Sequence, residues 1–344
     1  MRKAVMAGLC SAVLGAALVA APAVAADPGP TYGVYVRVLD APVGSFVEVT
    51  AALPDLLASA GWQLRASYDA GTGDCAYLAR VYVVTDPTWT AAVSGGGVDA
   101  AFVIPLRIAV YQDETGTHVS LANPQSLVRT VLSETSYEAA AAGVIARLKT
   151  ALAPLPGTIV EVQYGQMRDV GLIGKTMGVV AGGPFPSKVE DLGSTKVTST
   201  INVPALATAF AAAAETPTKR WGLHAVYRVD LPGGNLSIVG LTGDKMEAKA
   251  FAIVGNGGDE SRAAYSCPGI DHAPAFPLEV VVARDGDKVE LRAVDAMFRM
   301  KMYFEDAGTM KFAANMAMPG SIENEIRDLA EDALDALRGR TASR

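Results

Sequence analysis

Hydrophobic and polar positions along the first half of the chain predict a regular series of strands and helices. Residues 32–39 alternate as a strand, and residues 42–60 carry apolar side chains at helical spacing before Gly61, a residue that commonly ends helices. Four further strands are predicted from alternating or continuous apolar runs: residues 62–68, 76–85, 102–110 and 118–122. Ser136 is a favourable N-cap for a closing helix over residues 137–153. The predicted order is strand, helix, four strands, helix.

The second half of the chain follows the same pattern, which predicts an internal duplication. The motif W-x-L-x-A-x-Y begins at Trp62 and again at Trp221, 159 residues later. Residues 104–108 (IPLRI) correspond to residues 276–280 (FPLEV), 172 positions further on, and the closing helices lie 182 positions apart. The growing offset indicates that the second copy carries insertions.

The second copy is predicted to begin with a strand at residues 196–202 and a helix at residues 204–215, and to close with a helix at residues 321–337. Five strands are predicted between these helices: residues 221–230, 236–241, 246–254, 278–283 and 289–294. The predicted fold class is therefore α+β, built from two repeats of one unit.

The N-terminal residues 1–26 are predicted to be a secretory signal peptide. Arg2 and Lys3 precede an apolar stretch without acidic residues, and residues 23–25 (AVA) form an A-x-A cleavage site. The alternative is a membrane anchor, but the stretch is short for a spanning helix and is followed by Pro22. We therefore expect an exported protein, periplasmic or extracellular, with no membrane span after cleavage.

The remaining chain is predicted to form a first repeat domain (27–153), a Pro/Gly-rich connection (154–194) and a second repeat domain (195–344). Half of the 344 residues are hydrophobic, which excludes intrinsic disorder. The formal charge of the whole chain is −7 and becomes −9 without Arg2 and Lys3. This sign disfavours nucleic acid as a partner.

An apolar strand that contains Leu-Pro-like residues (104–111, IPLRIAVY) and the segment Ala122-Asn123-Pro124 resemble the bacterial domain-of-unknown-function 302 family. The resemblance is best over residues 34–153 and weaker over residues 195–337, where Val294-Asp295 replaces Asn123-Pro124. It implies antiparallel sheets with helices on one face, related to the saddle of TATA-binding proteins.

The family resemblance also implies that the two repeats pair as an internal pseudo-dimer, and pairing of such domains allows a homo-oligomer. Many members carry a cysteine after the proline of the apolar strand. Leu106 and Leu278 stand at those positions here, so any role of that thiol is absent. The family brings no established activity with it.

Two cysteines remain after signal cleavage, Cys75 and Cys267. An oxidising destination predicts a disulfide between them, and the alternative is two unrelated buried thiols. The catalytic inventory is sparse: the three histidines have unrelated spacings, and neither a zinc-binding H-E-x-x-H nor a G-x-S-x-G motif occurs. We therefore expect a protein that is not an enzyme.

Alternation places His224 on the strand face opposite Trp221 and Tyr227, where the first copy has Arg65. These two polar side chains are candidates for contact with a ligand on an open sheet face. The alternative is that both are solvated strand residues.

Residues 297–318 contain six methionines and are predicted to form an inserted hairpin, because apolar residues alternate on both sides of residues 306–308. Its apolar face would carry Phe298, Phe304 and Phe312 as candidate ligand contacts. Three uses are open: a grip on a hydrophobic ligand or partner, packing as core, or a Cu(I) site. The candidate copper ligands are Met300, Met302, Met316 and Met318.

These observations predict an exported, non-enzymatic protein that binds a small hydrophobic ligand or a protein partner, without a cofactor. The alternative is a periplasmic copper-binding or redox accessory protein that uses the methionine-rich segment.

Overall fold

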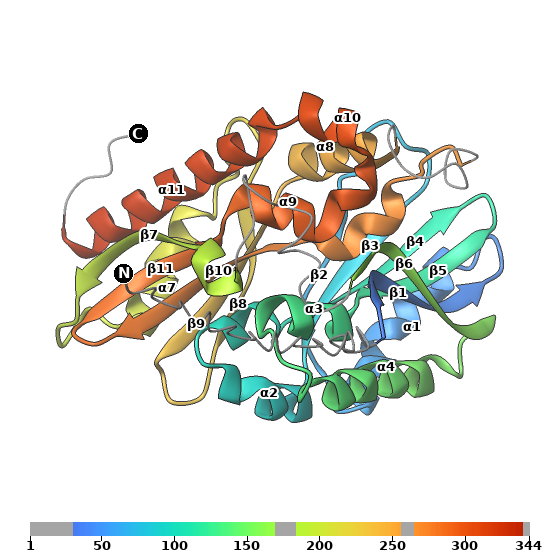
Figure 1. Ribbon diagram of the computed structural model, residues 1–344, viewed down its shortest axis with the longest axis horizontal. Coiled ribbons are helices and arrows are strands. Elements are labelled where there is room, and N and C mark those ends of the chain that lie inside the picture. The colour runs from blue at the N-terminus through green and yellow to red at the C-terminus, as the bar shows by residue number, and fades with distance from the viewer. Residues whose placement is uncertain (1–29, 169–183, 256–264, 340–344) are drawn as a thin grey trace, which may run out of the picture.

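The structure is a computed structural model that describes residues 30–168, 184–255 and 265–339 (Figure 1). The predicted signal peptide, residues 1–26, lies outside the described residues. None of the helices within the described ranges combines the length and apolar character that crossing a bilayer requires.

The first repeat contains a six-stranded antiparallel sheet with strand order β2-β3-β4-β5-β1-β6. Its strands are β1 (Tyr32–Ala41), β2 (Gln63–Asp69), β3 (Ala79–Thr85), β4 (Leu106–Asp113), β5 (Gly116–Ala122) and β6 (Thr158–Arg168). Its helices are α1 (Phe46–Ser59), α2 (Pro87–Val93), α3 (Pro124–Val131) and α4 (Glu138–Leu152), with 3-10 turns η1 (Ser94–Gly96) and η2 (Asp99–Phe102).

The second repeat contains a five-stranded antiparallel sheet with strand order β8-β9-β10-β11-β7. Its strands are β7 (Val189–Lys196), β8 (His224–Asp230), β9 (Leu236–Thr242), β10 (Leu278–Asp285) and β11 (Lys288–Val294). Its helices are α7 (Val203–Ala213), α8 (Asp244–Gly255), α9 (Ala296–Phe304), α10 (Thr309–Ala314) and α11 (Ala317–Leu337). Three 3-10 turns accompany them: η3 (Phe185–Lys188), η5 (Ile270–Ala275) and η6 (Glu305–Ala307).

Equivalent elements follow one another in the same order in both repeats, so the architecture repeats as the sequence predicts. β3 and β9 end at Thr85 and Thr242, and each strand leads at once into a helix. Asn123 caps α3, where its side chain accepts a hydrogen bond from the backbone N–H of Gln125. Asp295, 172 positions later, caps α9 in the same way and accepts from the backbone N–H of Phe298. Asp295 therefore corresponds to Asn123, and the prediction that Val294-Asp295 replaces Asn123-Pro124 is displaced by one residue.

Helices cover one face of each sheet, and the other face meets the opposite repeat. α1 and α4 pack on the first sheet, and α7 and α11 pack on the second. On the other faces, η5 of the second repeat contacts β3, β4 and β5, while the equivalent turn η2 contacts β9 and β10. The edge strands β2 and β8 also lie beside each other. This reciprocal packing forms the expected pseudo-dimer and buries the central strands β4 and β10 on both faces.

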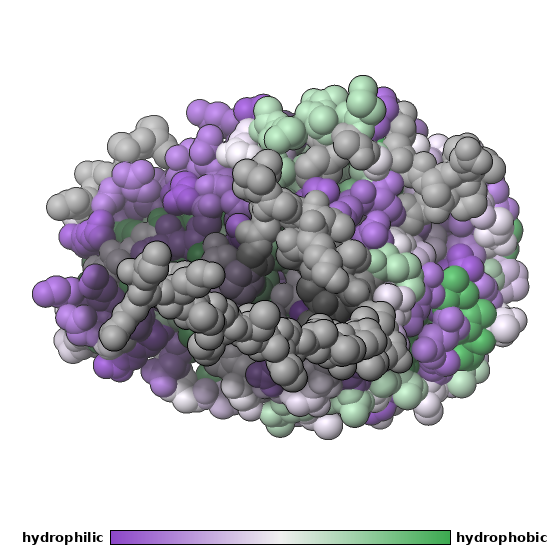
Figure 2. Space-filling view, viewed as in Figure 1, coloured by the Kyte–Doolittle hydropathy of each residue, from purple (hydrophilic) through white to green (hydrophobic). Residues whose placement is uncertain are grey.

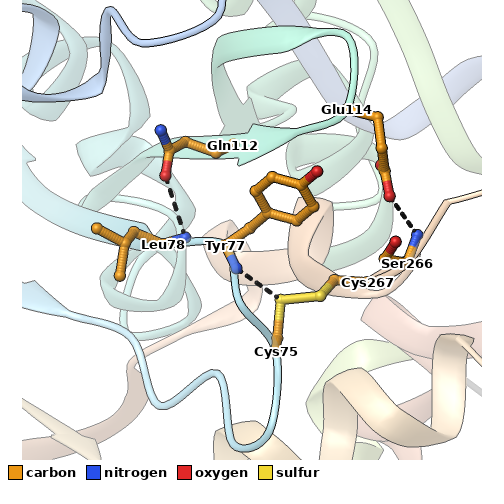
Figure 3. The surroundings of a disulfide bond; sticks show 7 residues. All are labelled: Cys75, Tyr77, Leu78, Gln112, Glu114, Ser266 and Cys267. Carbon is orange, nitrogen blue, oxygen red and sulfur yellow. Dashed lines mark hydrogen bonds between the residues drawn. A yellow bond between two sulfur atoms is a disulfide. The ribbon is translucent and has the colours of Figure 1, made fainter.

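Cys75 and Cys267 form the predicted disulfide, with Cα atoms 5.8 Å apart (Figure 3). Cys75 lies between β2 and β3, and Cys267 lies just before η5, so the bond joins the two repeats. Beside it, the carboxylate of Glu114 accepts a hydrogen bond of 2.6 Å from the backbone N–H of Ser266. The disulfide thus adds a covalent link close to the contact that η5 makes with β3.

The predicted methionine-rich hairpin is wrong, because residues 297–318 lie within α9, η6, α10 and the start of α11. The buried residues of α9 are Phe298, Arg299, Met302 and Tyr303, which is helical spacing. The alternation of apolar residues suggested a strand because Arg299 and Tyr303, both polar, belong to the buried stripe. A short window cannot separate the two periods when charged residues are buried.

Three further sequence assignments differ from the structure. Residues 246–254 form most of α8, whose buried positions again follow helical spacing. The connection predicted at 154–194 contains β6, which pairs with β1, and most of β7, so the strand predicted at 196–202 lies several residues earlier. The short helix α2 was not predicted; Asp86 caps it by accepting a hydrogen bond from the backbone N–H of Thr88.

Candidate ligand-binding site

An apolar cavity of about 70 Å³ lies in the second repeat, between the sheet and the helices α8, α9 and α11. These helices gather in the upper half of the view in Figure 1. The lining consists of aliphatic, aromatic and methionine side chains with one acid and one base. It is formed by Met246, Ala250, Ile253, Ala275, Phe276, Leu278, Glu279, Ala293, Val294, Ala296, Arg299, Met300, Phe304, Met318, Pro319, Ile322 and Ile326.

The first repeat shows why the cavity exists. Counting from Thr85 and Thr242, the position of Met246 on α8 corresponds to Trp89 on α2. Trp89 is fully buried, and its indole N–H donates a hydrogen bond of 2.8 Å to the carbonyl of Val103. A thin, flexible thioether thus stands in the second repeat where a rigid indole fills the first.

A buried ionic cluster forms one wall of the cavity. Arg107 on β4 donates through Nη1 to the carboxylate of Glu279 on β10, at 2.5 Å. The two residues occupy equivalent positions in the repeats and lie almost wholly out of solvent. Arg299 on α9 also approaches Glu279, with Nη2 at 3.5 Å from the carboxylate. One carboxylate therefore pairs with two guanidinium groups across the contact between the repeats.

Tyr303 holds these charges together. Its ring is in cation–π contact with the guanidinium groups of Arg107 and Arg299, whose central carbons are 4.8 and 4.7 Å from the ring centroid. Its hydroxyl accepts a hydrogen bond from Arg107 Nη2, and its carbonyl accepts one from the hydroxyl of Tyr35. Burial opposes the charge of Arg107, but Glu279 and Tyr303 outweigh this effect, so the pKa of Arg107 is raised.

A second, more polar pocket of about 370 Å³ lies at the boundary of the two repeats. Asp271 and Asp306 line it, and the fully buried His272 lies between their carboxylates. His272 Nδ1 is 2.6 Å from Asp271 and Nε2 is 3.0 Å from Asp306. Burial disfavours the imidazolium, but the two carboxylates outweigh burial and raise the pKa of His272 to about 9.

This arrangement predicts a pH-dependent stability. Because the folded pKa of His272 lies above the unfolded value of ~6.5, its contribution is complete below that pH and is lost as the pH rises through about 9. We expect the stability gap between wild type and His272→Gln to shrink by about 3 kcal/mol between pH 6 and pH 9.5. Urea unfolding of both proteins at the two pH values measures it.

A stability gap for His272→Gln that stays constant between pH 6 and pH 9.5 would contradict the assigned ion cluster.

The structure brings three of the candidate residues from the methionine-rich segment to the cavity: Phe304, Met300 and Met318. Phe298 is buried elsewhere, in an edge-to-face contact with Phe185. Phe312 lies in α10, and its side chain is outside the described part of the structure.

The four candidate copper ligands do not share one environment. Met300 and Met318 line the cavity, whereas Met302 is buried and absent from the lining, and Met316 is 45% exposed. Met300 and Met302 are two positions apart on one helix, a spacing that does not place side chains on the same face. Figure 2 shows apolar side chains gathered over α10, where Met310 is 84% exposed. This distribution does not favour the copper alternative.

His224 and Arg65 are not part of the cavity. His224 begins β8, and Arg65 lies on β2, where its Nε donates to Thr85 at 2.8 Å. Both residues sit on the neighbouring edge strands of the two sheets. A β-bulge between Leu64 and Ala66 interrupts the alternation assumed for β2, so Leu64 is exposed and does not share the buried side of Trp62.

The charged residues of the site, Arg107, Glu279 and Arg299, were missed in the sequence. One signal was available: Arg107 and Glu279 are charges of opposite sign at the same position of two otherwise apolar, corresponding strands. A charge in a strand that is buried on both faces needs a partner. Nothing comparable marks Arg299, because its burial depends on how α9 packs.

Part of the first repeat matches a known family of proteins. Residues 78–155 match the model of a family described as domain of unknown function DUF302, which confirms the resemblance for that part of the chain. A similar solved structure is the crystal structure of uncharacterized conserved protein DUF302 from Bacillus stearothermophilus. It has 18% sequence identity and a TM-score of 0.31, and the match covers 35% of this chain and 96% of that chain. None of the curated proteins compared with the chain matches it.

Proposed function

We propose that the protein is exported and binds a small apolar molecule in the cavity between α8, α9 and α11. The observation that carries the proposal is the lining itself, which is apolar except for Glu279 and Arg299. A mostly apolar pocket with a few convergent polar groups is the usual form of a small-molecule site.

The chemistry of the lining supports binding rather than catalysis. The residues that form the cavity wall in the described ranges include no hydroxyl, thiol or imidazole side chain, and their one carboxylate, Glu279, pairs with Arg107 and Arg299, which makes it a poor nucleophile. Three of them, Met246, Met300 and Met318, have flexible thioethers that adapt to the shape of a ligand. A volume of about 70 Å³ holds part of a chain, and methionine rotation would widen it.

Export is supported by the N-terminal sequence and by the disulfide. A covalent Cys75–Cys267 bond is stable in an oxidising compartment and uncommon in the cytosol. The predicted signal peptide would deliver the chain to such a compartment.

Filling the cavity tests the proposal. Met246→Trp copies the residue at the equivalent place in the first repeat, and the added indole should occupy the space of the ligand. With hexan-1-ol as the probe, we expect at least about tenfold weaker binding, since excluding two methylene groups costs ~1.6 kcal/mol. Titration followed by NMR of ¹³C-methyl-labelled methionine reads the binding directly at Met300 and Met318.

The matched control is Met310→Trp, which changes the same residue type on the exposed surface of α10. This variant should bind hexan-1-ol as wild type does, and the methyl group of Met316 should not shift in either protein. Unchanged binding by Met246→Trp, or no shift of Met300 and Met318 in wild type, would count against the proposed site.

A further inference from the structure

The cavity wall carries more positive than negative charge. Arg107 and Arg299 are both nine-tenths buried or more, and the ion pairs described for them go to one carboxylate, Glu279. Taking a charge out of water is costly unless the charge is paired. The cluster therefore holds one guanidinium that a single carboxylate does not balance.

Arg299 is the guanidinium that is less well paired and lies at the cavity. Its hydrogen bonds in the structure both leave from Nη2, to the carbonyls of Ala275 and Pro277 at 2.6 and 2.8 Å. Among the described residues its Nε is buried and has no acceptor, which is also true of the Nε of Arg107. Glu279 is closer to Arg107, at 2.5 Å, than to Arg299, at 3.5 Å.

Other acids near the cluster have partners of their own. Glu247 on α8 accepts hydrogen bonds from the hydroxyl of Thr242 and from the backbone N–H of Gly71, at 2.5 Å for the latter. Asp271 and Asp306 are partly buried and flank His272. The ion pair described for the guanidinium at the cavity wall is therefore its 3.5 Å contact with Glu279.

We propose that the ligand is an amphipathic monocarboxylate, whose apolar chain lies among Met246, Met300 and Met318 and whose carboxylate pairs with Arg299. This inference rests on the proposed function and adds the chemical class of the ligand. A carboxylate suits the site because it carries the single negative charge that the cluster lacks and accepts a charge-assisted hydrogen bond from a guanidinium. A neutral alcohol or a cationic amine of the same chain length does not supply this negative charge.

The experiment compares hexanoate, hexan-1-ol and hexylamine at pH 7, by titration of the full mature protein labelled with ¹³C-methyl methionine. We expect all detectable binding to shift Met246, Met300 and Met318, with hexanoate bound about tenfold more tightly than hexan-1-ol and hexylamine bound most weakly. Arg299→Gln leaves the Arg107–Glu279 pair balanced and removes the proposed partner of the carboxylate, so the ratio of hexanoate to hexan-1-ol affinity should fall from about tenfold to about one. Arg299→Lys keeps the charge and should keep the preference.

The outcomes separate the two proposals. Equal binding of hexanoate and hexan-1-ol by wild type, or tighter binding of hexylamine, would overturn the monocarboxylate inference and leave the apolar site intact. Absence of binding by all three probes would overturn the proposed function, and the inference with it. The wild-type comparison decides even if Arg299→Gln fails to fold, and in that case Arg299→Lys tests the role of the charge.

Discussion

The double substitution Cys75→Ala and Cys267→Ala is expected to lower the free energy of unfolding by about 4–5 kcal/mol, because the bond closes a very long loop. The two cysteines are 192 positions apart in the chain, so the cross-link removes many conformations from the unfolded state. Their Cα separation of 5.8 Å is in the ordinary range for disulfides. In the folded state the bond spans a contact between the repeats that also involves Ser266 and Glu114.

Urea unfolding of the oxidised wild type and of the double variant measures this effect, with reduced wild type as a second comparison. Reduced wild type and the double variant should agree closely if the bond itself is responsible. A loss below about 1 kcal/mol would show that the unfolded chain is already restricted near this link. Glu114→Gln is a useful control, because it alters the neighbouring hydrogen bond and leaves the disulfide in place.

Removing the carboxylate of Glu279 should have the second largest effect on the free energy of unfolding. Glu279→Gln leaves Arg107 and Arg299 buried without an opposite charge, and breaking a buried pair in this way costs about 3–5 kcal/mol. The loss should appear as a lower midpoint in urea unfolding with little change of slope.

A second substitution distinguishes charge imbalance from lost packing. Arg107→Gln added to Glu279→Gln restores the original surplus of one charge, so the double variant should be more stable than Glu279→Gln alone. If the two losses simply add, the assigned pairing of Arg107 with Glu279 would be wrong. The test depends on the sign of the coupling free energy between the two substitutions and not on its size.

Local patterns in the sequence identified the strands and the duplication because both depend on short-range periodicity. β10 and β11 were predicted almost to their ends, since apolar alternation and the turn Asp285-Gly286 agree. α8 and α9 were assigned as strands because their buried stripes include Glu247, Arg299 and Tyr303. Tertiary contacts bury these polar residues, and a hydrophobicity pattern does not record such contacts.

The candidate site was found in part for the same reason. Phe304, Met300 and Met318 were selected by composition, and they do meet, although on helices and not on a hairpin. Arg107, Glu279 and Arg299 come from three distant segments, and their encounter depends on how the repeats pack. These residues are far apart in the sequence, so their proximity is apparent only once the two sheets are placed against each other.

The pairing of Arg107 with Glu279 also favours contact between a first and a second repeat over contact between two like repeats. In a symmetric homodimer of single repeats, a residue that lies at the two-fold axis meets its own copy from the other subunit. Two arginines or two glutamates would then meet in a buried contact, where like charges repel strongly. Fusion into one chain removes that restriction and lets the equivalent positions differ in sign. The same difference disfavours the pairing of like repeats from two molecules, because a first repeat that met another first repeat would bring Arg107 against its own copy.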